Sequence, residues 1–195
     1  MGGDGDGLSI GAGHFPHAAR RNIDMTYIML DNNIYGMTKG QMSPTTHEDQ
    51  ATKTTPYGML EEPMNPLKIA LGYDVSFIAR GFSGNVKQTV DLIMQAIRHP
   101  GFAFVQLLSP CVTFVGRDQF DIIRSMAVDL DDNYDPSSVE NAWRIANEKG
   151  KISIGVIYRH DRPTFSQRMA HARALAHEKG DGDFDHLVNK YLVAA

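Results

Sequence analysis

The run Phe102-Ala-Phe-Val-Gln-Leu-Leu108 is almost continuously apolar. Such a run is typical of a strand that is buried on both faces of a parallel sheet. Three more short runs of strand-forming residues, each bounded by polar or turn residues, predict further strands at 25–30, 75–79 and 152–158.

Helices are predicted between and after these strands. Apolar side chains recur on one helical face across residues 86–97, and His99-Pro100-Gly101 ends that helix. Other helices are expected at 10–22, 66–71, 137–149, 163–179 and 184–193. Because strands alternate with helices, the predicted fold class is α/β, a parallel sheet with helices on both faces.

Composition excludes several classes of protein. The 195 residues include 19 Lys and Arg and 23 Asp and Glu, which gives a formal net charge of −4. This mild acidity offers no basic surface for nucleic acid, and no apolar run approaches the length of about 18 residues that a membrane span needs. Neither nucleic acid nor a membrane is therefore expected as a partner. The single cysteine, Cys111, favours a reducing, cytoplasmic location.

The chain opens on a loop of glycines and aspartates, residues 3–7. Glycines let backbone N–H groups approach a phosphate, but Asp4 and Asp6 would repel it unless a cation lies between them. Mg²⁺ suits that position because it binds one or two carboxylates together with phosphate oxygens. A disordered tail is the alternative, and the partly apolar residues from Leu8 onward argue against it.

Asn32-Asn33 follows the strand at 25–30, one βαβ unit after the glycine loop. Carboxyl ends of parallel strands carry the ligand loops of such sheets, and an Asn carbonyl is a suitable oxygen ligand for Mg²⁺. Gly-Asp-Gly with Asn-Asn at this spacing resembles the thiamine diphosphate-binding motif.

The likeness continues along nearly the whole chain. It is carried by the segments Gly3–Gly11, His14, His17-Ala18, Arg20–Asn22, Asn33–Gln41, Ser43–Thr46, Lys53–Gly58, Ala79–Phe82, Ser109–Cys111, Gly155–Tyr158 and Arg162–Thr164. Together they resemble the β subunit of 2-oxoacid:ferredoxin oxidoreductases, whose fold holds the diphosphate half of a thiamine diphosphate site.

This resemblance implies a set of cofactor residues. Mg²⁺ would be bound by Asp4, Asn32 and the backbone carbonyl of Ile34. Met37 would lie under the bent cofactor, with core packing as the alternative because Met is an adaptable filler. The residues against the cofactor would be Gly5, Asp6, Gly36, Met37 and Thr38.

Lys39 is the implied catalytic residue, as a point charge for the carboxylate of a 2-oxo acid. Its alternative is a solvated surface lysine. Lys53 and Arg80 are weaker substrate candidates for which structural roles are favoured. His14 and His17 have a metal-binding spacing without a third ligand, so hydrogen-bonded structural roles are favoured for both.

Cys111, in Ser-Pro-Cys, would be the fourth ligand of a [4Fe–4S] cluster. The alternative is that its side chain is buried and acts as a small hydrophobic residue. In the resembled family the other three cysteines precede the glycine loop. We therefore expect residues 1–195 to be a single thiamine diphosphate-binding domain of an N-terminally shortened chain. Such a chain would lack its first strand and its cluster-binding segment, and a cluster could form only with the missing cysteines.

The implied reaction is oxidative decarboxylation of a 2-oxo acid to an acyl-CoA, with electrons passing through iron–sulfur centres to ferredoxin. An α subunit would supply the glutamate that activates the cofactor. The segments 35–41 and 53–58 are more similar to 2-oxoglutarate-type members, and pyruvate is the alternative substrate. Two further alternatives are another thiamine-dependent class and a catalytically silent subunit that only binds α.

Overall fold

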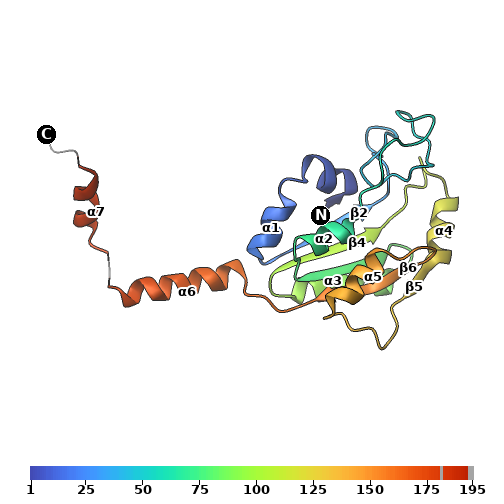
Figure 1. Ribbon diagram of the computed structural model, residues 1–195. Coiled ribbons are helices and arrows are strands. Elements are labelled where there is room, and N and C mark those ends of the chain that lie inside the picture. Colours follow the sequence, from blue (N-terminus) through green and yellow to red (C-terminus); the bar gives the residue numbers. More distant parts are fainter. Residues whose placement is uncertain (181, 193–195) are drawn as a thin grey trace.

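The computed structural model describes residues 1–180 and 182–192 and contains a six-stranded sheet (Figure 1). Its strand order is β1-β2-β4-β3-β6-β5. Strand β4 pairs in parallel with β2 and β3, and every one of its residues is buried, as its sequence predicts. The strands are β1 Gly2–Gly3, β2 Met25–Asp31, β3 Phe77–Phe82, β4 Phe102–Leu108, β5 Ala127–Asp129 and β6 Ile152–Arg159.

The sheet is mostly parallel, which confirms the predicted fold class, but β6 and its parallel neighbour β5 run opposite to the other four strands. Strand β6 runs antiparallel to β3, with Phe77 opposite Arg159 and Arg80 opposite Gly155. An apolar run reports burial and carries no information about strand direction, so the pattern did not predict this. Gly2 and Gly3 form the short strand β1, which pairs in parallel with Met29 and Leu30 of β2.

Eight helical segments accompany the sheet among the described residues. Pro16 lies in the first turn of α1, which begins at Phe15 because residues 6–10 form a separate π-helix. Helix α4 and strand β5 were not predicted. The segments are η1 Asp6–Ile10, α1 Phe15–Arg21, α2 Pro66–Gly72, α3 Val86–Arg98, α4 Asp118–Met126, α5 Val139–Ala146, α6 Phe165–Glu178 and α7 Phe184–Tyr191.

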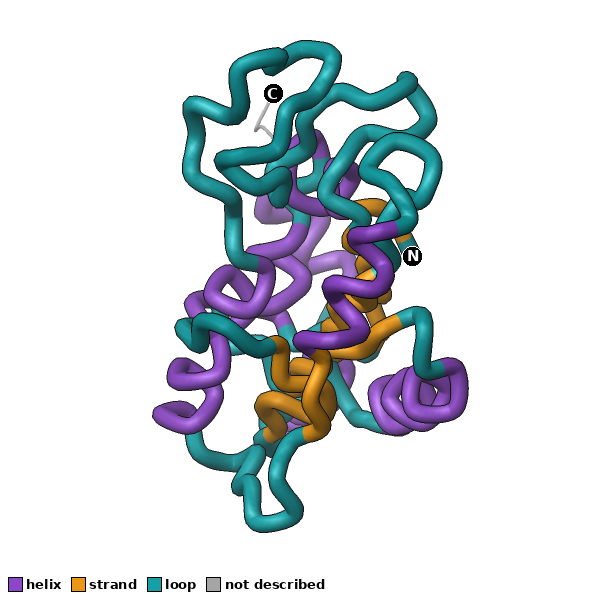
Figure 2. The backbone as a smooth tube through the Cα atoms, turned by 90° about the vertical axis from the view of Figure 1, so that its right-hand side faces the viewer, coloured by secondary structure: helices purple, strands orange, loops and turns teal. Residues whose placement is uncertain are grey.

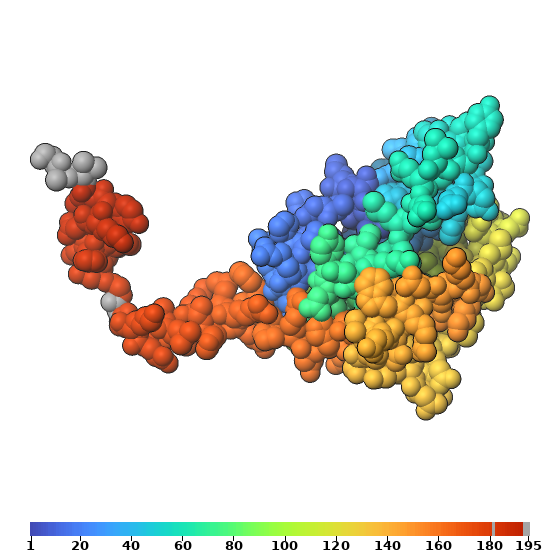
Figure 3. Space-filling view, in the orientation of Figure 1, coloured from blue at the N-terminus to red at the C-terminus, as the bar shows by residue number. Residues whose placement is uncertain are grey.

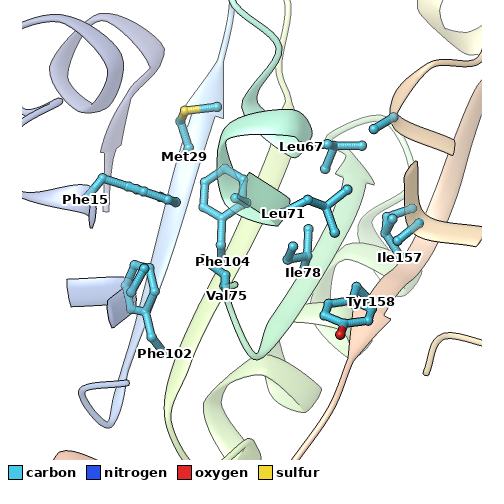
Figure 4. Close-up of a cluster of buried hydrophobic side chains, with 14 of the residues drawn as sticks. Phe15, Met29, Leu67, Leu71, Val75, Ile78, Phe102, Phe104, Ile157 and Tyr158 are labelled. Atoms are coloured by element: carbon cyan, nitrogen blue, oxygen red, sulfur yellow. The ribbon is translucent and has the colours of Figure 1, made fainter. Parts of the chain in front are cut away.

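Helices cover both faces of the sheet, as predicted. On one face α1, α2 and α5 bury a cluster that includes Phe15, Leu71 and Ile145 (Figure 4). The ring of Phe15 packs edge-on against Phe102 and Phe104, with centroids 5.4 Å apart in both pairs. On the other face Leu92 and Ala96 of α3 and Ile123 of α4 pack against β3, β4 and β6.

Helix α3 forms as predicted but leaves most of its apolar side chains in solvent. Val86, Val90 and Ile97 are 69%, 55% and 59% exposed, whereas Leu92 and Ala96 are buried. The helix therefore contacts the sheet through a narrower strip than its pattern of apolar residues suggests.

The two C-terminal helices extend away from the sheet (Figures 1 and 3). Helix α6 begins at a capping box formed by Thr164 and Gln167, and neither α6 nor α7 has a buried residue. Both helices are confirmed as predicted, although Val193, the last residue expected in α7, lies outside the described residues. None of the helices in the described part of the chain is long and apolar enough to cross a membrane.

The longest loops gather at one end of the molecule (Figure 2). One is the irregular segment between β2 and α2, and another follows β4. Both begin at the carboxyl ends of parallel strands, which is where ligands bind in sheets of this kind.

Candidate functional site

Three predicted metal-binding residues come together where β1 and β2 end side by side. Asp4 follows β1 and is 1% exposed. Asn32 follows β2, and its backbone N lies 3.5 Å from Asp4 Oδ1. The backbone N–H of Ile34 donates to Asn32 Oδ1 at 3.1 Å, which holds the first turn of this loop together. The parallel pairing of the two strands produces this convergence.

A second buried carboxylate lies behind Asp4. Asp31, the last residue of β2, is 3% exposed. The hydroxyl oxygen of Thr45 lies 2.7 Å from Asp4 Oδ2 and 2.9 Å from Asp31 Oδ1, so it joins the two carboxyl groups. Gln106 of β4 donates from Nε2 to Asp31 Oδ2 at 2.7 Å. Burial first, and then the charge of Asp4, raise the pKa of Asp31 to about 6.

This pair of carboxyl groups fits a bound cation. Among residues 1–180 and 182–192, the ion pairs formed by side chains involve neither Asp4 nor Asp31. The single hydroxyl hydrogen of Thr45 can be donated to only one of them. Burying uncompensated negative charge is costly, and a divalent cation at Asp4 would supply the missing positive charge. Carboxylate, amide and backbone carbonyl oxygens are also the ligands that Mg²⁺ accepts.

Residues 3–7, predicted as a loop, instead form the end of β1 and a helical turn that continues into η1, and this glycine-rich segment packs tightly against the segment that follows β2. A Cβ atom added at Gly5 would lie 2.2 Å from a ring carbon of Tyr35, so only glycine fits there without movement of the ring. The Tyr35 hydroxyl in turn donates to the carbonyl of Gly5 at 3.4 Å. Asp6 is exposed, and its Oδ2 accepts from the backbone N–H of Gly3 at 2.8 Å.

Residues 35–41 form a closed turn that carries the other predicted cofactor residues. Tyr35 and Gln41 form an antiparallel bridge, and the amide of Gln41 donates to the carbonyl of Thr38 at 2.7 Å. Met37 is 98% exposed, which excludes core packing for its side chain. Lys39 is exposed and has a φ of 78°, a left-handed conformation that disfavours a residue with a Cβ by about 1–2 kcal/mol.

Cys111 lies beside this turn. A methyl group at Gly36 would be 3.9 Å from Cys111 Sγ, and the cysteine is half-buried. Lys53 approaches the same turn, since its backbone N–H donates to the carbonyl of Gly40 at 3.1 Å and its Nζ lies 5.9 Å from the centre of the Phe114 ring. The structure thus places the backbone of Lys53 against Gly40, the residue that follows Lys39.

Arg80 has the structural role that the sequence favours. Its Nη2 lies 3.1 Å from Glu148 Oε1 in a buried ion pair, and its Nε donates to the carbonyl of Ser153 at 2.9 Å. His14, which precedes α1, and His17, which lies within it, are both exposed. In the part of the chain that the structure describes, no cluster of three or more His, Cys, Asp or Glu side chains could hold a metal.

An iron–sulfur cluster does not fit the residues of this chain alone. Cys111 is its single cysteine, whereas a [4Fe–4S] cluster normally requires four thiolates.

The site also contains three residues to which sequence reasoning gave no role, namely Asp31, Thr45 and Gln106. Two of them could have been identified from the sequence. Asp31 is a polar residue at the end of an apolar strand, and Gln106 is a polar residue inside one. Buried polar groups need partners, so such residues are expected to belong to a hydrogen-bonded network.

The fold and the site together define a thiamine diphosphate-binding α/β domain. The family model "Thiamine pyrophosphate enzyme, C-terminal TPP binding domain" matches residues 1–107. A second family model, for the C-terminal part of the pyruvate ferredoxin oxidoreductase beta subunit, matches residues 111–174. The chain belongs to the thiamine pyrophosphate enzymes, and within them it is similar to the beta subunits of 2-oxoacid:ferredoxin oxidoreductases.

The relatives agree with this assignment. The 2-oxoacid:ferredoxin oxidoreductase subunit beta of a Sulfolobus species is 36% identical over 86% of this chain and 59% of its own length. The 2-oxoglutarate synthase subunit KorB of Methanocaldococcus jannaschii is also 36% identical, over 86% of this chain and 62% of its own length. The chain therefore spans about three fifths of these relatives.

A solved structure is similar over almost the whole chain. It is a 2-oxoglutarate:ferredoxin oxidoreductase from Magnetococcus marinus with 2-oxoglutarate, coenzyme A and succinyl-CoA bound. The TM-score is 0.91 at 40% sequence identity, and the match covers 98% of this chain and 66% of that one.

Proposed function

We propose that this protein acts, together with an α subunit, in the CoA-dependent oxidative decarboxylation of a 2-oxo acid, with 2-oxoglutarate as the favoured substrate and ferredoxin as the electron acceptor. The observation that carries the proposal is the meeting of Asp4 and Asn32 at neighbouring strand ends, beside the turn that presents Lys39. Relatives named for 2-oxoglutarate support the choice of substrate.

In this proposal the chain binds the diphosphate half of the cofactor. Asp4, Asn32 and the carbonyl of Ile34 hold Mg²⁺. Bound thiamine diphosphate supplies a nucleophilic carbanion and an electron sink for the decarboxylation. The residues that orient it are Gly5, Asp6, Gly36, Met37 and Thr38. The buried position of Asp4 supports the assignment, because the carboxylate would otherwise lack a compensating charge.

Lys39 binds a carboxylate of the substrate in this proposal. A lysine in the left-handed region is less stable than a glycine there, and strain of this kind is found at functional sites. The side chain is exposed on the turn, so its ammonium group is available to an anionic ligand. A flexible point charge suits a carboxylate whose position depends on the bound cofactor.

The proposal includes partners that supply what this chain does not. The glutamate that activates the cofactor comes from the α subunit, and CoA accepts the acyl group. Cys111 contributes one thiolate to a [4Fe–4S] cluster whose other ligands come from outside this sequence. A cytoplasmic location follows, because such a cluster and a free thiol both require reducing conditions.

The test uses the αβ complex. Calorimetric titration with thiamine diphosphate should give binding that requires Mg²⁺, and CoA-dependent reduction of a viologen dye should be faster with 2-oxoglutarate than with pyruvate. If the complex assembles but binds no cofactor, the chain is a catalytically silent subunit. A preference for pyruvate would overturn the proposed substrate only.

Lys39 can be tested separately with Lys39→Gln and Lys39→Gly. Loss of a charge-assisted contact of about 1.5–3 kcal/mol should raise the KM for the 2-oxo acid at least about tenfold, with cofactor affinity unchanged. Lys39→Gly should not lower the melting temperature, because glycine relieves the left-handed backbone. Lys87→Gln, which removes an exposed lysine on α3, is the matched control and should leave KM unchanged. Equal KM values for all variants would refute the role of Lys39.

A further inference from the structure

We propose that Thr45 is a positioning residue for the metal site, which holds the carboxylate of Asp4 in the orientation that binds Mg²⁺. Asp31 and Gln106 lie behind it. The inference rests on the proposed function, since it concerns the cation that accompanies the cofactor.

Thr45 contacts both the carboxylate of Asp4 and the Asn32-Asn33 segment. It belongs to the long loop between β2 and α2, is 3% exposed, and contacts Asp4 through its hydroxyl at 2.7 Å. Its backbone carbonyl accepts from Asn33 Nδ2 at 2.8 Å, so the same residue is bound to the Asn-Asn segment. A β-branched side chain has little freedom about χ1, and the hydroxyl therefore stays where the backbone puts it.

The support behind Thr45 reaches the central strand. Asp31 Oδ1 lies 2.9 Å from the Thr45 hydroxyl, and Gln106 holds the other oxygen of Asp31 at 2.7 Å. Asp31, Thr45 and Gln106 all line a cavity of about 500 Å³. When Thr45 donates its single hydroxyl hydrogen to Asp4, Asp31 is held by Gln106 and by Asn33 Nδ2, which donates to Asp31 Oδ1 at 3.3 Å.

This arrangement leaves the two oxygens of Asp4 in different surroundings. Oδ2 accepts from the Thr45 hydroxyl at 2.7 Å, while Oδ1 accepts only a longer hydrogen bond from the backbone N–H of Asn32 at 3.5 Å. A carboxylate held more tightly through one oxygen would favour coordination through the other, more weakly held oxygen. Mg²⁺ requires nearly ideal octahedral geometry, whereas the larger Ca²⁺ accepts two oxygens of one carboxylate. Thr45 should therefore favour Mg²⁺ over Ca²⁺ at this position.

The experiment measures metal affinity in the αβ complex at saturating thiamine diphosphate. Thr45→Val removes the hydroxyl at nearly constant volume, and Thr45→Ala serves the same purpose if the valine variant does not fold. Either should weaken Mg²⁺ binding by about 10- to 100-fold, as found for residues that orient metal ligands. The ratio of Mg²⁺ to Ca²⁺ affinity should fall as well, and Thr45→Ser, which keeps the hydroxyl but not the β-branch, should restore most of both losses.

Thr52→Val is the matched control, because Thr52 is a nearly buried threonine of the same loop whose hydroxyl contacts Thr55 at 2.7 Å. It should lower stability without changing metal affinity or the Mg²⁺ to Ca²⁺ ratio. If the wild-type complex binds no cofactor in the presence of Mg²⁺, the proposed function fails. If the wild type binds normally and the Thr45 variants keep its metal affinity and ratio, the positioning role alone is overturned.

Discussion

The removal of one buried amide, Asn22→Ala, should destabilise the protein more than most single substitutions. Asn22 ends α1 and is fully buried in a left-handed conformation with a φ of 49°. Its Oδ1 accepts from the backbone N–H of Phe102 at 2.9 Å and from Ser76 Oγ at 2.8 Å. Its Nδ2 donates to the carbonyl of Arg162 at 2.9 Å. One side chain thus joins α1, β4, the segment before β3 and the segment before α6.

The expected loss follows from these contacts. Each of the three short hydrogen bonds contributes about 0.5–1.5 kcal/mol, and a buried backbone group left unpaired costs about 1–3 kcal/mol. Alanine in a left-handed conformation adds about 1 kcal/mol. Because these terms overlap and water can enter the space left by the amide, we expect a decrease of about 4 kcal/mol in the free energy of unfolding. For a chain of this size that corresponds to a decrease of about 10 °C in melting temperature.

Thermal unfolding followed by circular dichroism at neutral pH measures the effect. Asn22→Gly should lose about 1 kcal/mol less than Asn22→Ala, because glycine accepts the left-handed conformation. Asn85→Ala removes an exposed helix cap with one bond to the N–H of Gln88 and should cost only about 1 kcal/mol. The reasoning is refuted if Asn22→Ala lowers the melting temperature no more than Asn85→Ala does.

Three further predictions concern other buried groups. The Tyr134 hydroxyl donates to a strand carbonyl at 2.6 Å, and burial raises its pKa to about 12. The folded state holds this proton more tightly than the unfolded state. The contribution of Tyr134 to the free energy of unfolding should therefore be complete below about pH 10 and should be lost between about pH 10 and 12. Urea unfolding across this pH range should show a smaller decrease in the free energy of unfolding for Tyr134→Phe than for the wild type. Equal decreases in the two proteins would contradict the raised pKa of Tyr134. Arg80→Ala leaves Glu148 buried without its cation and should lower the free energy of unfolding by about 3–5 kcal/mol. A loss below about 1 kcal/mol in urea unfolding would argue against a buried ion pair. Gly5→Ala forces its Cβ against the Tyr35 ring, so calorimetry on the αβ complex should show weaker thiamine diphosphate binding, and unchanged affinity would mean that the ring moves freely.

Most of the fold could be predicted from the pattern of apolar residues, and the exceptions have physical causes. The strand predicted at 75–79 begins two residues too early and ends three residues too early, and it ends early because Arg80 and Gly81 are unusual in a buried strand. Arg80 is accommodated there only because Glu148 lies beside it. Helix α4 is not predicted, because only Ile123 among its residues is buried and its apolar pattern is weak.

The direction of β6 and the exposure of α3 could not be predicted either. The alternation of apolar residues indicates that a segment has a buried side, but not which neighbour it contacts. The apolar pattern of β6 is the same in either direction, and the chain has already reversed its direction between β4 and β5, because β5 and β6 run parallel to each other. The apolar face of α3 is exposed at Val86, Val90 and Ile97 because the sheet meets the helix at Leu92 and Ala96.

For the site, the sequence by itself determined the chemical groups and their order. Asp4 after one strand end and Asn32 after the next have to meet once the two strands pair in parallel, so a local motif and a strand order were sufficient. Only the tertiary structure decided what surrounds them. Thr45 and Gln106 reach Asp31 from 14 and 75 residues away, across a loop and a neighbouring strand. Hydrogen bonds between such distant residues depend on three-dimensional position alone, and spacing along a single chain does not encode it.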